Sequence, residues 1–265
     1  MTQPSDFQEF SCKQCLEASV LDFDFSMAFQ PIVDIRNGKV FGYEALVRGV
    51  NNESAASVLA QVNESNRYRF DQKCRVKAIA LASELNLQSI LSINFLPNAV
   101  YRPELCIRTT LEAAKTYRFP IENILFEFTE GEKIQDSSHV KNIVTHYQSV
   151  GFKTATDDFG SGYSGLNLLA DFQTDIIKFD MDLIRNIHQD PVRQAIIQHS
   201  VNLCDALNIQ TLAEGIECQE ELAALQKMGV QLIQGYYFAK PGFEHLPEVD
   251  LSLIPWSISF INSLP

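Results

Sequence analysis

Residues 26–48 read SMAFQPIVDIRNGKVFGYEALVR. Two runs rich in β-branched and aromatic residues, 26–35 and 40–48, are separated only by the tetrapeptide RNGK. An Asn-Gly step in so short a connection is typical of a tight β-hairpin. We therefore predict that the first two strands of the fold run antiparallel to each other.

Downstream of this hairpin, short apolar runs alternate with longer segments of helical period. This alternation is typical of repeated βα units. The further predicted strands are 89–95, 123–130, 152–159, 176–181, 211–217 and 232–239, and the predicted helices are 67–85, 103–117, 139–150, 194–207 and 219–228. Eight strands in this pattern predict the α/β class and a (β/α)8 TIM-type barrel.

The length and composition favour one domain. With 265 residues, 46% hydrophobic and 20% charged, the chain resembles an ordinary globular protein that fills one large barrel. We predict a leader at 1–25, the barrel at 26–250, and a C-terminal tail at 251–265 that packs on the barrel. No run of about 20 apolar residues is present, and the acidic N-terminus differs from a signal peptide, so a cytoplasmic location is expected.

Charge and cysteine content limit the partners and the compartment. Lysine and arginine number 21 against 33 acids, a net charge of -12, which argues against a nucleic acid polymer or an anionic membrane as partner. Six cysteines are too few for a disulfide scaffold. Cys12 and Cys15 form a CxxC pair without a second pair, so an incidental pair of thiols is favoured over a metal or redox role.

Nearly every predicted strand carries a polar side chain toward its C-terminal end. In a barrel these ends meet at one mouth, where active sites are assembled. Alternate residues of a strand share a face, so Glu44, Leu46 and Arg48 point the same way. The polar residues are Glu44, Asn94, Glu127, Asp157, Asp158, Lys178, Glu214 and Gln234.

Five of these side chains are carboxylates, against one lysine. Crowded carboxylates do not all stay ionised unless cations intervene, and an all-oxygen ligand set favours Mg²⁺ or Mn²⁺ over Zn²⁺. Adjacent Asp157 and Asp158 reach one site if the strand ends there, and Gly160 and Gly162 favour such a turn. The number of acids predicts two metal ions, a geometry suited to phosphodiester hydrolysis.

The hexapeptide YEALVR at 43–48 resembles the signature of the EAL domain, the family of cyclic di-GMP phosphodiesterases. Seven further motifs stand in the order typical of that family. They are QPIV at 30–33, SIN at 92–94, EFTE at 127–130, DDFGSGYS at 157–164, IKFD at 177–180, AEGIE at 213–217 and QGY at 234–236. This number of ordered motifs makes the resemblance far more specific than the tripeptide alone.

The resemblance implies a barrel whose first strand is antiparallel to the others, two divalent ions (Mg²⁺ or Mn²⁺), and hydrolysis of cyclic di-GMP to the linear dinucleotide pGpG. It implies a catalytic role for Lys178 and Glu214, which hold or activate water. Asp180 is a third catalytic candidate on other grounds: it shares a strand face with Lys178, so it either orients the lysine or only balances charge. The implied metal ligands are Glu44, Asn94, Glu127, Asp157 and Asp158; the implied substrate-binding residues are Gln30, Leu46, Arg48, Gln234 and Pro241; Glu130 is implied to brace a loop.

Two departures refine the resemblance. Where many family members continue with Trp and a His-Pro segment, this chain has GVNNES at 49–54, a variant that resembles EAL domains attached to blue-light-sensing flavin modules. Ser161 replaces a common Thr and keeps its hydroxyl. The resemblance also implies a homodimer joined near 161–172, although burial of Leu166, Leu168, Leu169 and Phe172 against the barrel is the alternative.

Two other functions stay open at this stage. A degenerate domain of the same fold would bind cyclic di-GMP without cleaving it and would act through a protein partner. All the expected ligands are present, which favours the enzyme. A metal-dependent lyase built on another barrel would explain the carboxylates but not the ordered motifs.

Overall fold

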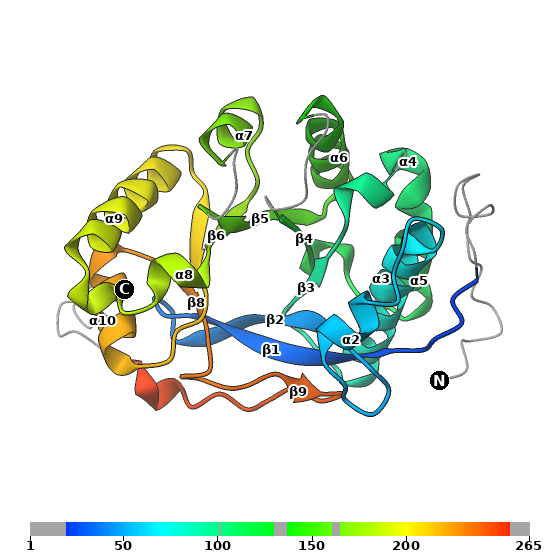
Figure 1. Ribbon diagram of the computed structural model, residues 1–265, viewed down its shortest axis with the longest axis horizontal. Coiled ribbons are helices and arrows are strands. Elements are labelled where there is room, and N and C mark those ends of the chain that lie inside the picture. The colour runs from blue at the N-terminus through cyan, green and yellow to red at the C-terminus, as the bar shows by residue number, and fades with distance from the viewer. Residues whose placement is uncertain (1–19, 101, 130–136, 161–164, 255–265) are drawn as a thin grey trace.

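The predicted hairpin opens the fold in the computed structural model, which describes residues 20–254 apart from 101, 130–136 and 161–164 (Figure 1). Strands β1 (Ser26–Asp34) and β2 (Lys39–Arg48) pair antiparallel, with Ser26 opposite Arg48 and Gln30 opposite Glu44. Gly38 in the connection has φ of 62°, a left-handed conformation that glycine adopts at little cost. The Asn-Gly prediction is therefore confirmed.

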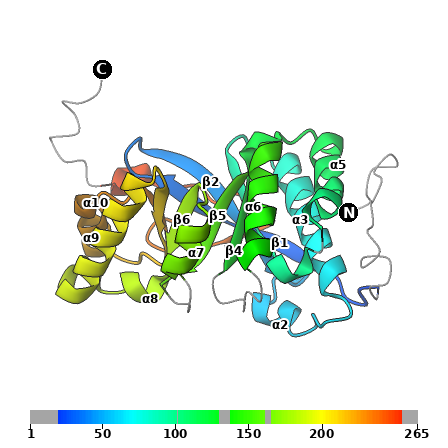
Figure 2. The ribbon, with the colours of Figure 1, turned by 90° about the horizontal axis from the view of Figure 1, so that it is seen from above.

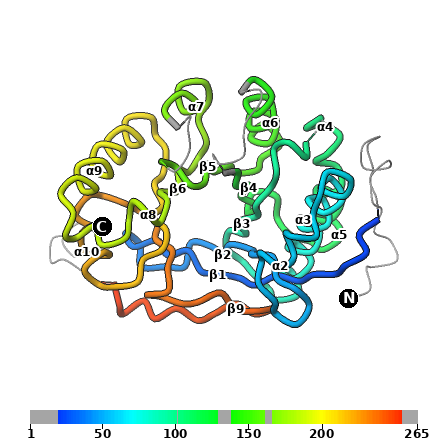
Figure 3. Tube along the Cα trace, in the orientation of Figure 1, coloured from blue at the N-terminus to red at the C-terminus, as the bar shows by residue number. Residues whose placement is uncertain are grey.

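Six parallel strands continue from β2 and bring the sheet back to β1. The strand order is β2-β3-β4-β5-β6-β7-β8-β1, and the β1–β2 pairing closes the barrel. β1 runs antiparallel to both of its barrel neighbours, as predicted. The further strands are β3 (Ile90–Asn94), β4 (Ile124–Thr129), β5 (Lys153–Phe159), β6 (Ile176–Phe179), β7 (Gln210–Ala213), β8 (Leu232–Gln234) and β9 (Gly242–Phe243), the last of which runs beside β1 outside the closed barrel (Figure 3).

Helices lie outside the strands, as Figures 1 and 2 show. Helix α10 illustrates why they form: Glu220 and Glu221 in its first turn and Lys227 in its last complement the helix dipole, and Gly229 ends it with φ of 89°. The helices are α2 (Ala55–Leu59), α3 (Arg67–Glu84), α4 (Pro103–Cys106), α5 (Arg108–Thr116), α6 (Ser137–Val150), α7 (Gly165–Asp171), α8 (Met181–Ile184), α9 (Pro191–Ala206) and α10 (Gln219–Met228), with 3₁₀ turns η1 (Pro97–Ala99), η2 (Ile121–Asn123), η3 (Ile187–Gln189) and η4 (Leu251–Leu253).

The last two barrel strands are shorter than predicted. Residues 214–217 leave the sheet as a loop after β7, and β8 ends at Gln234 because the backbone of Ile216 approaches Gly235. A Cβ at Gly235 would lie 2.1 Å from the carbonyl oxygen of Ile216, so only glycine permits this approach. The predicted helix 103–117 divides into α4 and α5, and the short elements α2, α7, α8 and β9 were not predicted.

Two large clusters of buried apolar side chains fill the space between the strands and the helices. Ile254, the last described residue, is buried in the second cluster. In the segment suggested as a dimer contact, Leu168, Leu169 and Phe172 are buried in the protein itself, and Leu166 is 67% exposed. Three of these four apolar side chains are therefore buried within the protein itself.

Candidate active site

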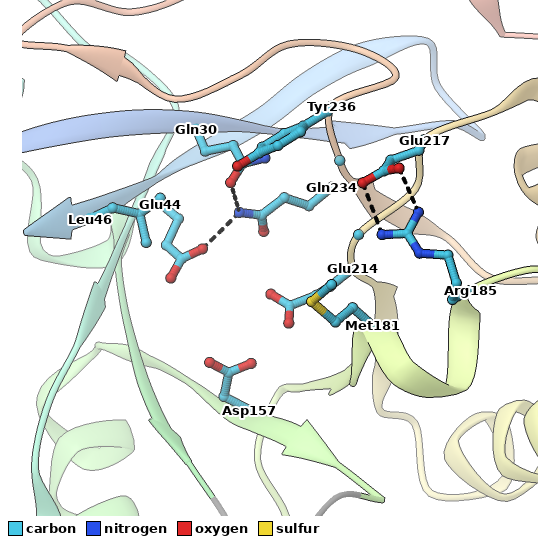
Figure 4. A pocket seen from close by; sticks show the side chains of 12 residues that line it. Gln30, Glu44, Leu46, Asp157, Met181, Arg185, Glu214, Glu217, Gln234 and Tyr236 are labelled. Atoms are coloured by element: carbon cyan, nitrogen blue, oxygen red, sulfur yellow. Dashed lines mark hydrogen bonds and ion pairs between the residues drawn. The ribbon is translucent and has the colours of Figure 1, made fainter. Parts of the chain in front are cut away.

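The polar residues predicted at the strand ends converge at the carboxyl-terminal mouth of the barrel. A cavity of about 320 Å³ opens there. Figure 4 shows Glu44, Asp157 and Glu214 pointing into one space from β2, β5 and the loop after β7. Gln30, Leu46 and Gln234 also line it; their contact with the substrate stays a prediction.

Lys178 is the centre of the acidic cluster. Its side chain is completely buried in β6, and its Nζ lies 2.7 Å from Glu214 Oε1 and 2.8 Å from Glu127 Oε2. The same amine lies 3.1 Å from Asp157 Oδ1 and 3.8 Å from Glu44 Oε2. A buried cation surrounded by four acids is an electrostatic arrangement that folding alone rarely favours, and it marks a functional site.

Hydrogen bonds from neighbouring strands orient Glu44. Asn94 Nδ2 at the end of β3 donates to Glu44 Oε1 over 2.7 Å, and Gln234 Nε2 donates to Glu44 Oε2 over 2.7 Å. The Gln234 amide also donates to Gln30 Oε1 over 3.2 Å, an interaction drawn in Figure 4. With its amide on Glu44, Asn94 keeps its carbonyl oxygen for another partner.

Burial raises the pKa values of three acids in the cluster, Glu127, Asp157 and Glu214. It raises the pKa of Glu127 to about 8, against the opposing charge of Lys178, and it raises the pKa of Asp157 and that of Glu214 as well. Burial lowers the pKa of Lys178, but the surrounding charges of Asp157, Glu127 and Glu214 raise it well above its ordinary value. The lysine is therefore protonated at neutral pH, whereas the raised pKa values of Glu127, Asp157 and Glu214 reflect how unfavourable negative charge is at these buried positions without further cations.

The backbone turns at the end of β5 so that two adjacent aspartates serve one site. Asp158 has φ of 55°, a left-handed conformation, and the pairing between β5 and β6 shifts register here. Gly160, with φ of 100°, continues the turn as predicted, whereas Gly162 lies outside the described residues. Burial and the nearby charge of Asp157 raise the pKa of Asp158 to about 6. Asp158 itself therefore begins the turn that was attributed to the glycines.

The acids form two groups with the spacing of metal ligands. In each group the ligand atoms of three residues lie within 4.8 Å of one another, and Asp157 belongs to both; the groups are Glu44, Glu127, Asp157 and Asp157, Asp158, Glu214. Glu127 Oε1 is buried without a hydrogen-bond partner among the described residues. An unpaired buried carboxylate oxygen and an all-oxygen donor set fit divalent cations such as Mg²⁺, Mn²⁺ or Ca²⁺.

Other predicted residues lie elsewhere. Arg48 donates to the carbonyl oxygen of Val47 over 2.7 Å, and neither Arg48 nor Pro241 is among the described residues that line the cavity. Asp180 follows the end of β6 and accepts from the backbone of Asp182 over 2.8 Å as the N-cap of α8, and its charge acts on Asp158. Orientation of Lys178 by Asp180 is therefore not what this geometry favours. Glu130 lies outside the described residues.

Sequence reasoning missed an ion pair at the rim of the cavity. Arg185 after α8 contacts both carboxylate oxygens of Glu217, each over 2.9 Å, and both side chains line the cavity with Met181 and Tyr236 (Figure 4). Strand periodicity places Glu217 on the face opposite Glu214, so a solvated or loop-bracing position was as plausible from the sequence as a direct one. The aromatic ring of Tyr236, 54% exposed at the mouth, offers a stacking surface to a base.

Residues 14–241 match the family model described as EAL domain. The chain belongs to the EAL domain family. A standalone versatile EAL protein from Vibrio cholerae, solved in a c-di-GMP-bound form, is 67% identical to this EAL chain with a TM-score of 0.86, over 89% of this chain and 100% of that chain.

Other EAL relatives are longer proteins. Klebsiella pneumoniae BlrP1, solved with manganese and cyclic di-GMP, is 34% identical with a TM-score of 0.81, over 87% of this chain and 59% of its own. The blue light- and temperature-regulated antirepressor BluF of Escherichia coli is 33% identical over 84% of this chain. A cyclic di-GMP phosphodiesterase of Pseudomonas aeruginosa is 30% identical over 82% of it. The present chain spans 55% and 38% of the lengths of these two relatives.

Proposed function

We propose that this EAL chain is a metal-dependent phosphodiesterase that hydrolyses cyclic di-GMP to pGpG. The observation that carries the proposal is the pair of carboxylate groups that share Asp157 at the mouth of the barrel. The relatives named above support the substrate: two were solved with cyclic di-GMP, and one is named a cyclic di-GMP phosphodiesterase.

The donor set supports a proposal for the residues that would hold the ions. Glu44, Glu127 and Asp157 would hold one ion with the carbonyl oxygen of Asn94, and Asp157, Asp158 and Glu214 would hold a second. Two divalent cations supply charge neutralisation for the phosphate and acidify water. We propose Mg²⁺ or Mn²⁺ as these ions because every donor is a hard oxygen.

The protein's own groups complete the reaction. Protonated Lys178 donates hydrogen bonds within the cluster and can stabilise charge that develops on phosphate oxygens. Glu214, 2.7 Å from that amine, can accept the proton of the attacking water. Gln30, Leu46 and Gln234 would contact the substrate from β1, β2 and β8, and Tyr236 would stack on a base at the mouth.

A receptor that binds cyclic di-GMP without cleaving it is the alternative function. Loss of metal ligands would favour it, whereas both carboxylate groups and Lys178 are assembled here. A lyase of another barrel family is not favoured, because the chain belongs to the EAL family. The geometry therefore supports catalysis.

Chromatography of cyclic di-GMP incubated with the purified protein tests the proposal. With Mg²⁺ or Mn²⁺ we expect conversion to pGpG, which excess chelator and Glu44→Ala each abolish. Glu84→Ala, at the exposed end of α3, is the matched control and should retain wild-type rates. Binding of cyclic di-GMP without any product would identify a receptor instead.

Three further expectations remain proposals. We propose a homodimer that uses the exposed Leu166 on α7, and sedimentation of the wild type and of Leu166→Glu tests this. The division into leader, barrel and tail stays a prediction. The cytoplasmic location also stays a prediction; within the described ranges, no helix combines the length and the apolar character needed to cross a membrane.

A further inference from the structure

A second cluster of ligating groups lies outside the cavity, and the proposed reaction does not use it. It joins three segments: His188 in η3, Cys218 directly before α10, and Glu221 in the first turn of α10. One ligating atom from each residue lies within 4.8 Å of the other two. The cluster contains sulfur and nitrogen, unlike the all-oxygen groups at the barrel mouth.

The carboxylate of Glu221 is buried and held in one orientation. Glu221 is only 2% exposed. Oε1 accepts from the backbone N–H of Asn186 over 2.8 Å, and Oε2 accepts from that of Glu217 over 2.9 Å. Each oxygen keeps a further lone pair, and metal-ligating carboxylates are themselves commonly fixed by hydrogen bonds of this kind.

The imidazole of His188 has one nitrogen whose bonding is unexplained. Nδ1 is buried and has no hydrogen-bond partner within the described part of the chain. Nε2 lies 2.8 Å from the side-chain amide of Gln189. The Gln189 atom in this contact is the amide nitrogen, which donates to Nε2. If a cation takes Nδ1, Nε2 carries the proton instead, and the Gln189 amide turns by 180° so that its oxygen accepts the second hydrogen bond that metal-bound histidines commonly make.

Cys218 supplies the ligand that determines which metal fits. Its thiol is free of any disulfide. Thiolate, imidazole and carboxylate together form a set typical of Zn²⁺, with a water molecule as the fourth ligand of a tetrahedron. We propose that His188, Cys218 and Glu221 bind one Zn²⁺ ion. On binding, the sulfur–metal bond forms as the thiol proton passes to solvent.

An ion here would tie together the loops that form the rim of the active site. Cys218 follows Glu214 by four residues, and the Glu217 backbone between them already bonds Glu221. The Asn186 backbone, which also bonds Glu221, follows Arg185 of the cavity rim. Zn²⁺ should therefore stabilise the folded state, because a ligand that binds only the folded state shifts the folding equilibrium toward it.

Co²⁺ titration tests the site directly, because a thiolate ligand gives a sulfur-to-cobalt charge-transfer band that carboxylate sites do not. The parent for all variants is C12S/C15S, which removes the other cysteine pair. We expect the band to saturate at one equivalent and to disappear on addition of Zn²⁺. Cys218→Ser should abolish the band, and His188→Ala should weaken Co²⁺ binding by at least about tenfold.

Controls separate this site from the active site and from misfolding. His199→Ala, at an exposed histidine of α9, should leave the titration unchanged. Glu44→Ala, which disables the proposed reaction, should keep the band. Zn²⁺ should raise the melting temperature of the parent more than that of Cys218→Ser. Circular dichroism should show that both proteins are folded. Absence of the band in the parent, or its persistence in folded Cys218→Ser, would overturn the proposal.

Discussion

The amine of Lys178 lies 2.7 Å from Glu214 Oε1, and the lysine side chain is completely buried. Within the described part of the chain, the acids that compensate its charge are ones that we assign to metal binding. Each cation that enters the cluster must therefore share these carboxylates with the lysine. The amine lies within hydrogen-bonding distance of three acids. Its role is therefore electrostatic.

Lys178→Ala should lower kcat by about 10²- to 10³-fold while changing the dissociation constant of cyclic di-GMP much less. An interaction that strengthens as charge develops on phosphate oxygens appears in the barrier and little in the ground state. Lys178→Arg should not restore activity, since a planar fork does not replace a compact ammonium. Paired kcat and binding measurements decide this, and normal turnover at saturation with weak binding would assign Lys178 to binding alone.

Gln234→Ala should weaken metal binding by about 10- to 100-fold, because the amide that orients Glu44 is lost. At saturating Mg²⁺ the activity of Gln234→Ala should recover substantially. This recovery distinguishes a residue that orients the metal ligand Glu44 from the ligand itself. Mg²⁺ dependence of the rate is the measurement. Gln210→Ala, in an exposed position at the start of β7, is the control, and an equal effect there would refute the assignment.

The metal-free protein should lose stability as the pH rises from about 5 to 8. Burial raises the pKa of Glu127 from 4.5 to about 8, so the folded state holds a proton that the unfolded chain releases. The free energy of unfolding therefore falls across this window. Melting temperatures in chelator at several pH values test this, and Glu127→Gln should flatten the dependence. Saturating Mg²⁺ should restore stability at pH 8.

Ca²⁺ should support substrate binding without turnover. Its bonds to oxygen are longer and its geometry looser than those of Mg²⁺, so the attacking water is misplaced while charge is still neutralised. BlrP1 was solved with calcium and cyclic di-GMP together, in agreement with binding. Calorimetric titration and product chromatography in the same Ca²⁺ buffer check both halves, and rapid cleavage there would contradict this geometry.

Strand patterns and motifs predicted the barrel and most of the acidic cluster, because period and turn chemistry are local properties. Asn37-Gly38 predicted the hairpin. The positions of the acids at the ends of the predicted strands predicted that these side chains would lie close together. The pairing of Arg185 with Glu217 was not predictable, since it depends on how two loops leave the barrel. For the same reason Asp180 was expected beside Lys178, although β6 ends at Phe179 and Asp180 caps α8 instead.

The cluster of His188, Cys218 and Glu221 shows the same limit. Cys218 comes 30 positions after His188, and this spacing matches no metal-binding motif. For that reason no histidine was assigned to a metal site from the sequence. Only the three-dimensional arrangement of η3 and α10 brings the ligating atoms together.

The reversed direction of β1 determines where a neighbouring domain would act. Because Ser26 pairs with Arg48 at the carboxyl-terminal end of β2, the chain enters the barrel at the catalytic rim. In an all-parallel barrel it would enter at the opposite end. A sensor module joined upstream of this strand would therefore be attached beside the active site, and a small movement of that junction could reach Gln30 within five residues of chain.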